Sequence, residues 1–197
     1  AALLELMEEG KMTVDGNTYV LPEPFFVIAT QNPFGSAGTQ LLPDSQLDRF
    51  MVRLNLGYPS ITDEVEIMKN RQISNPLDTI QSIITPQMMT TFQKQVDQVF
   101  ISDEIYYYIV AIVDATRHNE YIEQGASPRG SLATMKVAKA CAFMHDRDYV
   151  IPSDVKDVVH MVLAHRIILN YDAKMKEMSA YSLLDDILDH IREPGIE

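Results

Sequence analysis

Beyond residue 60 the hydrophobic positions recur every three to four residues, which is the spacing of one face of an α-helix. The segment after Ser102 is the clearest example, because Ile105, Ile109 and Ile112 share one face. Capping residues and prolines in the first turn mark where helices begin. We therefore expect helices to open near Ser60, Pro86, Ser102, Ser127 and Pro152, and a last helix to carry Leu184, Ile187, Leu188 and Ile191.

The first 57 residues have a different pattern, in which short apolar runs alternate with turn residues. Residues 25–30 (FFVIAT) are apolar or β-branched without polar alternation, as in a strand buried on both faces of a parallel sheet. A second apolar strand is expected near residues 50–56. The turn signal Asp15-Gly16-Asn17 predicts a hairpin between Lys11–Val14 and Thr18–Val20, and a short helix is expected around Asp44–Asp48.

Two amide side chains, Gln31 and Asn32, follow the first apolar strand directly, and Pro33 ends it. Open α/β sheets hold their ligands at the carboxyl ends of central strands, which is where these amides would lie. A core strand that runs into a simple turn explains the same residues. Both interpretations stay open at this point.

The sequence Gly57-Tyr58-Pro59 is the best domain boundary in the chain. It predicts an α/β part at residues 1–57, with two parallel strands and a hairpin, and an all-helical part at residues 58–197. The whole chain should be predominantly helical. Residues 1–9 (AALLELMEE) have a helical pattern without a start signal, so we expect the chain to be a fragment of a longer protein.

Composition and charge exclude several classes of protein. With 46% hydrophobic and 22% charged residues, the chain is typical of a soluble globular protein. Its formal net charge of −12 argues against binding to nucleic acid, which needs clustered lysines and arginines. No apolar run approaches the roughly 20 residues that span a bilayer. The single cysteine, Cys141, cannot form an internal disulfide, which favours a cytoplasmic location.

Two arginines are candidates for chemistry. Arg49 lies in Leu47-Asp48-Arg49-Phe50, where Phe50 is expected to anchor the turn while Asp48 and Arg49 project outward. An exposed arginine is commonly part of a solvated surface. The same placement suits an arginine finger, which neutralises the charge that grows on a γ-phosphate and is worth about 10³ to 10⁵ in rate.

Arg129 is expected in the first turn of the helix that Ser127 and Pro128 open. A cation at that positive end of the helix dipole is disfavoured by roughly 0.3 to 1 kcal/mol. Solvent can screen this cost. Alternatively an anion shares the site, since the first turns of helices bind phosphates readily.

Other familiar chemistry is not supported. The segment from Gly125 to Ser131 lacks the lysine that a phosphate-binding loop requires. His160 and His165 are five residues apart and do not share a helical face, so no metal site is expected. Cys141 lies among apolar residues and is interpreted as a buried small hydrophobe.

The ordered segments LLELMEEGKMTVDGNTYVLPEPFFVIATQNP, LPDSQLDRF, GYPS, SPRG and RDYVIPSDV resemble the MoxR family of AAA+ ATPases. Each motif alone is weak, but the ordered combination is specific and covers nearly the whole chain. The resemblance implies a remnant of a P-loop NTPase core, with the hairpin before sensor 1, followed by a helical lid domain.

The resemblance also implies roles for individual residues. Asn32 matches sensor 1, which orients the attacking water near the γ-phosphate. Arg49 matches the arginine finger, which acts across a subunit boundary, and Arg129 matches sensor 2, a lid arginine that contacts the nucleotide. His165-Arg166 falls in a recurrent lid segment to which the resemblance assigns no role.

The sequence departs from the family at two places. Gly130 stands where alanine is commoner in the family, which costs a helix up to about 1 kcal/mol. The phosphate-binding loop and the acidic Mg²⁺-binding strand would precede Ala1. The strand of that loop would lie between residues 25–30 and 51–56. We therefore expect the segment before Gly57 to be less ordered, swapped or paired with another copy, and the helical part to be compact.

For the intact parent, the resemblance implies ATP and Mg²⁺ as cofactors and self-association into a ring, expected to be hexameric. Its output would be the remodelling, maturation or metal loading of partner proteins, often ones with von Willebrand factor A domains. The fragment itself should bind no nucleotide and hydrolyse none. The ATPase subunit of a magnesium chelatase and a non-catalytic helical interaction module are the alternatives. The coding sequence upstream of Ala1 would discriminate them.

Overall fold

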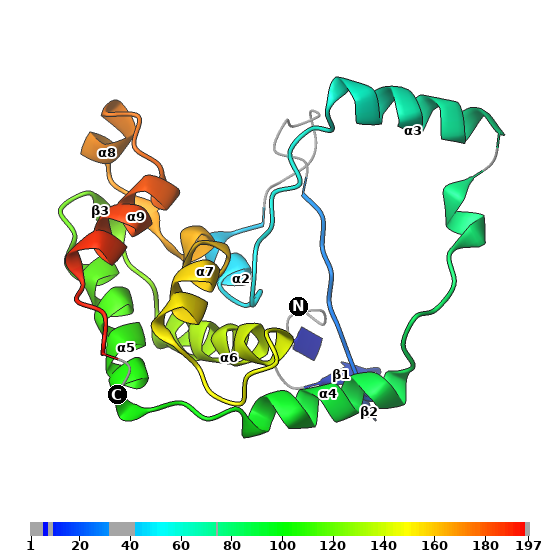
Figure 1. The fold of residues 1–197 in the computed structure, drawn as a ribbon, viewed down its shortest axis with the longest axis horizontal. Helices are drawn as coiled ribbons and strands as arrows, with labels where there is room; N and C mark the ends of the chain where they lie inside the picture. Colours follow the sequence, from blue (N-terminus) through cyan, green and yellow to red (C-terminus); the bar gives the residue numbers. More distant parts are fainter. Residues whose placement is uncertain (1–5, 8–9, 32–41, 74, 196–197) are drawn as a thin grey trace.

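The protein is described by a computed structural model that covers residues 6–7, 10–31, 42–73 and 75–195. Helices predominate, and the strands form two small antiparallel pairs (Figure 1). The elements are β1 (Lys11–Val14), β2 (Asn17–Val20), α2 (Asp44–Leu47), α3 (Ile61–Ile73), the 3-10 helix η1 (Pro76–Thr79), α4 (Pro86–Gln98), α5 (Asp103–His118), β3 (Ile122–Gln124), α6 (Pro128–Met144), α7 (Pro152–Leu163), the 3-10 helix η2 (Ala164–Arg166), β4 (Ile168–Leu169), α8 (Tyr171–Met175) and α9 (Ala180–His190).

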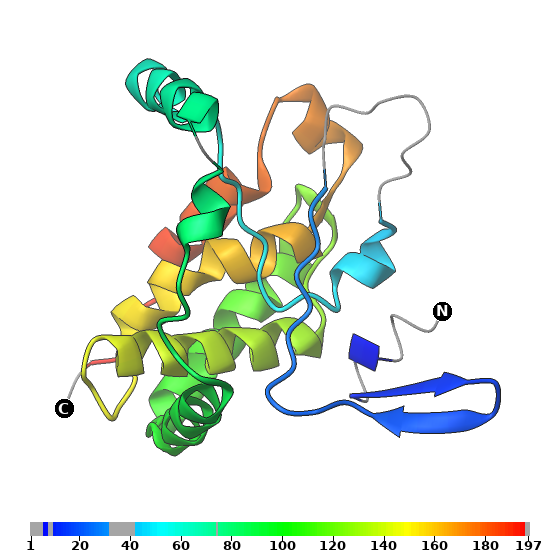
Figure 2. The same ribbon diagram turned by 90° about the vertical axis from the view of Figure 1, so that its right-hand side faces the viewer.

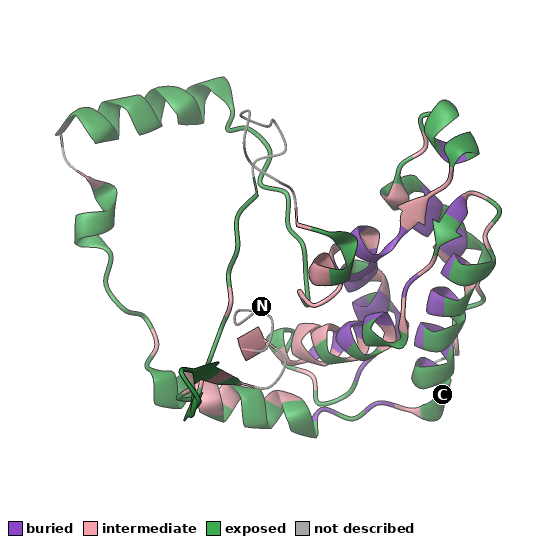
Figure 3. Ribbon diagram, turned by 180° about the vertical axis from the view of Figure 1, so that it is seen from behind, coloured by how far each residue is buried: buried purple, intermediate pink, exposed green. Residues whose placement is uncertain are grey.

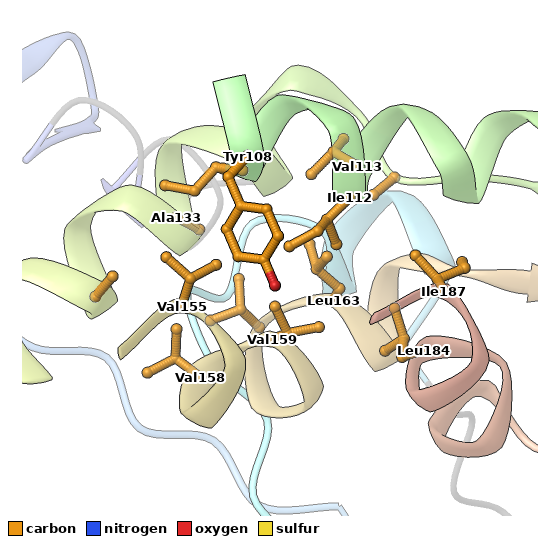
Figure 4. Close-up of a cluster of buried hydrophobic side chains, with 14 of the residues drawn as sticks. Tyr108, Ile112, Val113, Ala133, Val155, Val158, Val159, Leu163, Leu184 and Ile187 are labelled. Carbon is orange, nitrogen blue, oxygen red and sulfur yellow. The ribbon is translucent and has the colours of Figure 1, made fainter. Parts of the chain in front are cut away.

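The hydrophobic core lies between α5, α6, α7 and α9 (Figure 4). The apolar stripes predicted around Ile112 and Leu184 supply part of it, and α7 adds Val159 and Leu163. All four side chains are at most 1% exposed. Burying a side chain of this size stabilises a fold by about 1.5 to 3 kcal/mol. In Figure 3 the buried residues are concentrated in this bundle, whereas α3 and the segment before it are exposed.

The predicted helix starts are confirmed, and three of them have a side-chain cap, whereas Ser102 forms no such hydrogen bond at the start of α5. The Ser127 hydroxyl accepts a hydrogen bond from the Arg129 amide at 3.2 Å, and the Thr85 hydroxyl accepts one from the Met88 amide at 3.2 Å. Ser60 accepts from the Asp63 amide at 3.2 Å. These bonds satisfy amides that have no partner within their own helix, which is why the helices begin where they do.

The two predicted parallel strands at residues 25–30 and 50–56 are not formed. Both segments lie outside any strand and have no strand partner among the described residues. Most of their side chains are exposed, Ile28 at 90% and Leu56 at 96%. A strand satisfies its amides and carbonyls through its neighbours, so an apolar run alone does not produce a sheet. Whether the segment before Gly57 is swapped or paired with another copy stays a prediction. The expectation of a compact helical part holds for the bundle of α5, α6, α7 and α9, whereas the described residues of α3 are exposed and α4 has no buried residue.

The predicted hairpin is present, with β1 and β2 antiparallel and Val14 opposite Asn17. Asp15 and Gly16 both have positive φ, as this turn requires. A second strand pair was not predicted, and one of its strands is β4 (Ile168–Leu169). That strand, β4, pairs antiparallel with β3 and joins the end of α5 to the end of η2. The short helices η1 and α8 were also missed.

The segment that follows α2 lies against the bundle. The Arg53 amide donates to the Met161 carbonyl of α7 at 2.8 Å, and Figure 2 shows this part of the chain beside α7. On the opposite side, α4 packs against α6 through Phe92 and Phe143, whose ring centroids are 6.2 Å apart. Among the described helices, none has the length and apolar content needed to cross a membrane.

Candidate functional site

The candidate site is built where the turn after α2 meets the end of α7 and the first turn of α6. Arg166, in η2, is the centre of the contact, and its side chain is 2% exposed. Its Nε donates to the Asp48 carboxylate at 3.1 Å. Its Nη1 donates to the Val162 carbonyl within the same helical segment. Arg166 is thus a buried cation paired with a carboxylate that is 118 residues away in the sequence.

The same guanidinium also holds the backbone of the turn. Nη2 donates to the Asp48 carbonyl at 3.2 Å and to the Phe50 carbonyl at 2.7 Å, and Nη1 donates to the Met51 carbonyl at 3.3 Å. Burial and the nearby Arg129 lower the pKa of Arg166, and Asp48 raises it. An arginine stays protonated under such shifts, so the group remains a rigid fork of donors.

His165 lies beside Arg166 and faces the same turn. Its Nε2 is 3.1 Å from the Phe50 carbonyl oxygen. Burial, with repulsion from the Arg166 guanidinium, lowers the pKa of His165 to about 4. The ring is therefore neutral at pH 7. Its Nε2 is also 3.1 Å from Nη1 of Arg166, and its Nδ1 is buried and has no hydrogen-bond partner among the described residues.

Asp48 is the anion at the first turn of α6. The Ser127 hydroxyl donates to the two Asp48 carboxylate oxygens at 3.4 Å and 3.2 Å. The Arg129 guanidinium lies 3.7 Å from the same carboxylate. The expectation that an anion shares this helix start with Arg129 is met by a side chain of the protein itself. The expectation that Asp48 projects outward from its turn is wrong, because Arg166 draws the carboxylate inward.

The loop before α6 is tied to the end of α5, and this places Ser127. The Ala126 amide donates to the Thr116 hydroxyl at 3.0 Å, and Arg117 Nε donates to the Ala126 carbonyl at 2.9 Å. Gly125 passes so close to α5 that a Cβ built on it would lie 2.5 Å from the Thr116 carbonyl oxygen. Only glycine fits here without movement of the backbone.

Gly130 is buried where α6 meets α7 and η2. A Cβ at this position would lie 3.1 Å from a Leu163 methyl and 3.5 Å from Cδ of Arg166. The glycine that departs from the commoner alanine therefore allows close packing of α6 on the residues that hold Arg166.

The three site residues inferred from the sequence have different outcomes. Arg49 lies in the turn that Arg166 holds and is half-buried. Arg129 lies at the start of α6, with its side chain 49% exposed, and reaches Asp48, the neighbour of Arg49. The structure thus brings the two arginine segments together. Asn32 lies outside the described residues. The sequence did not predict that Asp48, Ser127 and Arg166 contact one another. The only indication was that His165-Arg166 falls in a segment that recurs in the lids of the family.

A second cluster of polar side chains joins α6 to α7. Sγ of Cys141 is 3.7 Å from Nδ1 of His145, and that nitrogen is 3.9 Å from the Asp154 carboxylate. Both carboxylate oxygens of Asp154 already accept hydrogen bonds from Arg147. Burial, and the Asp154 charge, raise the pKa of the Cys141 thiol. A guanidinium on the carboxylate and a protonated thiol oppose metal binding, so the cluster is a structural connection.

Comparison with known proteins gives the same picture over both ends of the chain. Residues 1–52 match the family model described as the ATPase family associated with various cellular activities (AAA). Residues 114–187 match the model of the AAA lid domain.

Individual relatives are similar over almost the full chain. The chaperone MoxR1 of Mycobacterium tuberculosis is 36% identical over 205 residues, and the uncharacterized protein YeaC of Bacillus subtilis is 43% identical over 194 residues. These matches cover 100% and 98% of this chain but only 54% and 61% of the relatives.

A crystal structure of a Cytophaga hutchinsonii protein, provisionally described as an ATPase, superimposes with a TM-score of 0.90 at 37% identity. The match covers 98% of this chain and 61% of that one. The predominantly helical fold with a small α/β portion is therefore shared with an ATPase-like protein of greater length.

Proposed function

Because this chain belongs to the MoxR family of AAA+ ATPases, we propose that it is the distal part of an ATP-hydrolysing core together with its lid. In the parent protein, ATP hydrolysis in a ring oligomer would drive the remodelling, maturation or metal loading of partner proteins. ATP and Mg²⁺ would be the cofactors. The chain spans 54% to 61% of the relatives, so these activities are proposed for the parent and not for residues 1–197 alone.

The observation that carries the proposal is the Asp48 carboxylate between Arg129 and Arg166. Asp48 directly precedes Arg49 in the chain, and its carboxylate is 3.7 Å from the Arg129 guanidinium. The α2 turn and the start of α6 therefore lie together at one edge of the lid. We propose that both arginines act on a single nucleotide at the boundary with a neighbouring subunit.

The roles we propose are electrostatic. Arg49 would neutralise the charge that grows on the γ-phosphate during its transfer. Arg129, at the positive end of α6, would contact the nucleotide and exchange its Asp48 partner for phosphate oxygens. Asn32 would be sensor 1 and orient the attacking water. Residues 1–197 contain no GxxxxGK[ST] sequence, so we expect no ATP hydrolysis from them by themselves.

The partner class is a further part of the proposal. A relative named as a chaperone supports action on other proteins. Proteins with von Willebrand factor A domains are the proposed clients, and a hexamer is the proposed ring. A magnesium-chelatase type of output would use the same core and differ in its client.

A non-catalytic interaction module is the second candidate, and one surface favours it. On α5, Tyr107 is 78% exposed, and Tyr106 and Val110 are exposed beside it. Exposed aromatic side chains of this kind commonly contact other proteins. In this reading the helical part would bind its partner without any coupling to nucleotide hydrolysis.

The test is ATP hydrolysis by the full-length gene product and by two variants. Arg49→Ala should lower kcat by about 10³-fold, as for other arginine fingers. Arg129→Ala should weaken nucleotide binding or hydrolysis while the helical fold is retained, as read by circular dichroism. A matched control is Arg71→Ala on α3, an exposed arginine of the same chain.

Mixing experiments test the action across a boundary. Arg49→Ala subunits are mixed with subunits whose phosphate-binding loop has lost its lysine. Neither kind should be active alone, but in a mixed ring Arg49 of one subunit can act on the intact nucleotide site of the other. Recovery of hydrolysis supports a finger that acts in trans. Assembled rings without recovery would contradict it, and a full-length protein that binds its client but never hydrolyses ATP would establish the interaction module.

A further inference from the structure

We propose that Arg166 is a positioning residue for Arg49, and that it makes the placement of this arginine depend on how the lid is docked. The inference rests on the proposed role of Arg49 as a finger. The inference gives a role to Arg166, to which the resemblance to the family assigns none.

Arg166 forms hydrogen bonds with the residues on both sides of Arg49. Its guanidinium donates to the carbonyls of Asp48 and Phe50, the residues on either side of Arg49, at 3.2 Å and 2.7 Å. Its Nε also donates a hydrogen bond to the Asp48 carboxylate at 3.1 Å. Since the direction of a side chain follows from the backbone that carries it, bonds to both flanking residues constrain where Arg49 points.

The turn that carries Arg49 follows a very short helix. Within it, the Arg49 amide donates to the Gln46 carbonyl at 3.2 Å and the Phe50 amide donates to the Leu47 carbonyl at 3.0 Å. The helix α2 has only four residues, which is too short to be stable by itself. Contacts with the lid therefore help to order the turn. Among the described residues, Arg166 forms four of these polar contacts, to the Asp48 carboxylate and to the carbonyls of Asp48, Phe50 and Met51.

Arg166 is itself anchored in the lid. It follows α7 directly, donates to the Val162 carbonyl of that helix, and packs against Gly130 of α6. A displacement of α7 relative to α2 moves the guanidinium away from the Asp48 and Phe50 carbonyls together. The turn that carries Arg49 thereby senses the position of the lid of its own subunit.

A merely structural arginine is the competing explanation, and the two differ in their kinetic signature. A positioning role predicts a lower kcat with an unchanged KM for ATP, because ground-state binding does not use the finger. Misplacing a catalytic group by about 1 Å can cost on the order of 100-fold in rate. A structural role predicts a lower melting temperature and a loss of activity in proportion to unfolded protein.

The experiment compares Arg166→Lys with Arg147→Lys in the full-length protein. Arg147 also lies in the lid, and its two terminal nitrogens donate hydrogen bonds to the buried carboxylate of Asp154. No contact with the α2 turn is seen for it among the described residues. Lysine keeps the charge at both sites and loses the fork. We expect Arg166→Lys to lower kcat by about 10- to 100-fold, with KM changed less than about threefold, and Arg147→Lys to leave kcat within about threefold.

Two further measurements test whether Arg166 affects hydrolysis through Arg49. In the Arg49→Ala background, Arg166→Lys should change kcat by less than about twofold, because residues that act as a unit are not additive. Mixed with subunits that lack the phosphate-binding lysine, Arg166→Lys subunits should recover activity, since the intact partner then presents the finger. If Arg166→Lys rings do not assemble, the same two measurements are made on Asp48→Asn, which removes the carboxylate partner of Arg166.

The outcomes separate the two proposals. An Arg166→Lys protein with normal kcat, an additive loss in the Arg49→Ala background, or assembled mixtures without recovery would overturn the positioning role while Arg49→Ala behaves as expected. If Arg49→Ala itself leaves kcat unchanged, the proposed function is overturned first, and the inference with it.

Discussion

Arg166 and Asp48 form an ion pair at 3.1 Å, although they are 118 residues apart in the sequence. The pair connects the end of the lid helix α7 to the turn after α2. On its other side the Asp48 carboxylate meets Ser127 and Arg129 at the start of α6. Three segments that are far apart in the sequence are thus held by one carboxylate, and their stability should be coupled.

Replacing Asp48 with asparagine should destabilise this junction. The Arg166 guanidinium is almost fully buried and would lose its counter-ion, which costs about 1 to 3 kcal/mol when the other hydrogen bonds are kept. Urea unfolding of the 197-residue protein measures it. Asp44→Asn, an exposed change at the start of the same helix, should shift stability by less than about 0.5 kcal/mol. Equal effects of the two changes would refute the coupling.

His165 makes the stability of the protein depend on pH. Its folded-state pKa of about 4 lies below the ordinary value near 6.5, so the unfolded chain binds the proton first. Stability contributed by the neutral ring is complete above about pH 6.5 and is lost as the pH falls toward 4. His165→Gln, which can still donate to the Phe50 carbonyl, should remove this part of the slope.

The measurement is the urea midpoint of both proteins between pH 8 and pH 4. The two curves should run parallel from pH 8 to pH 7 and converge or cross as the pH falls through the range from about 6.5 to 4. Parallel curves over the whole range would show that His165 is not buried in its neutral form.

Gly125→Ala should be destabilising out of proportion to its size. The added methyl would lie 2.5 Å from the Thr116 carbonyl oxygen and 2.7 Å from Cα of Arg117, and backbone atoms cannot rotate away. Overpacking of this kind costs about 1 to 3 kcal/mol. Thermal unfolding measures the cost, and Gly195→Ala, where a Cβ meets no atom within 4 Å, is the matched control. A stable Gly125→Ala protein would mean that the loop before α6 is not packed on α5.

Asp154→Asn should weaken the start of α7 and change the acid stability. Burial would raise the pKa of Asp154, but hydrogen bonds from Arg147 and the Ile151 amide outweigh it and hold the pKa below its ordinary value. The stabilisation is therefore present at neutral pH and is lost as the pH falls below about 4.

We expect the variant to be less stable by about 1 to 3 kcal/mol at pH 7, and the difference from wild type to shrink in acid. Urea unfolding at pH 7 and pH 3 tests this. Asp148→Asn, an exposed change in the preceding loop, should have little effect at either pH. A difference that grows in acid would contradict the direction of the pKa shift.

Several features followed from residue order alone. Helix starts at Ser60, Pro86 and Ser127 depend on local caps and on proline geometry, so a single segment specifies them. The hairpin at Asp15-Gly16 is equally local, because its turn needs positive φ within two residues. The core positions of α5 and α7 follow from helical spacing, and Ile112 and Val159 are buried as that spacing indicates.

The two apolar runs at residues 25–30 and 50–56 show the opposite case. Their composition is typical of buried strands, yet most of their side chains are exposed and neither run has a strand partner among the described residues. Strand pairing is a relation between segments, and no local signal specifies whether the partner lies alongside. The β3–β4 pair was missed for the same reason, since each strand has at most three residues.

What the sequence determined by itself is the helical lid, its caps, its apolar faces, and the two arginines that stand out by position and resemblance. What only the tertiary structure decided is which carboxylate shares the start of α6 with Arg129, and which side chain holds the turn that carries Arg49. The reason is physical: caps and helical stripes are set within a few residues, whereas the Asp48–Arg166 pair forms only after α7 and α2 have been brought together by the packing of the core.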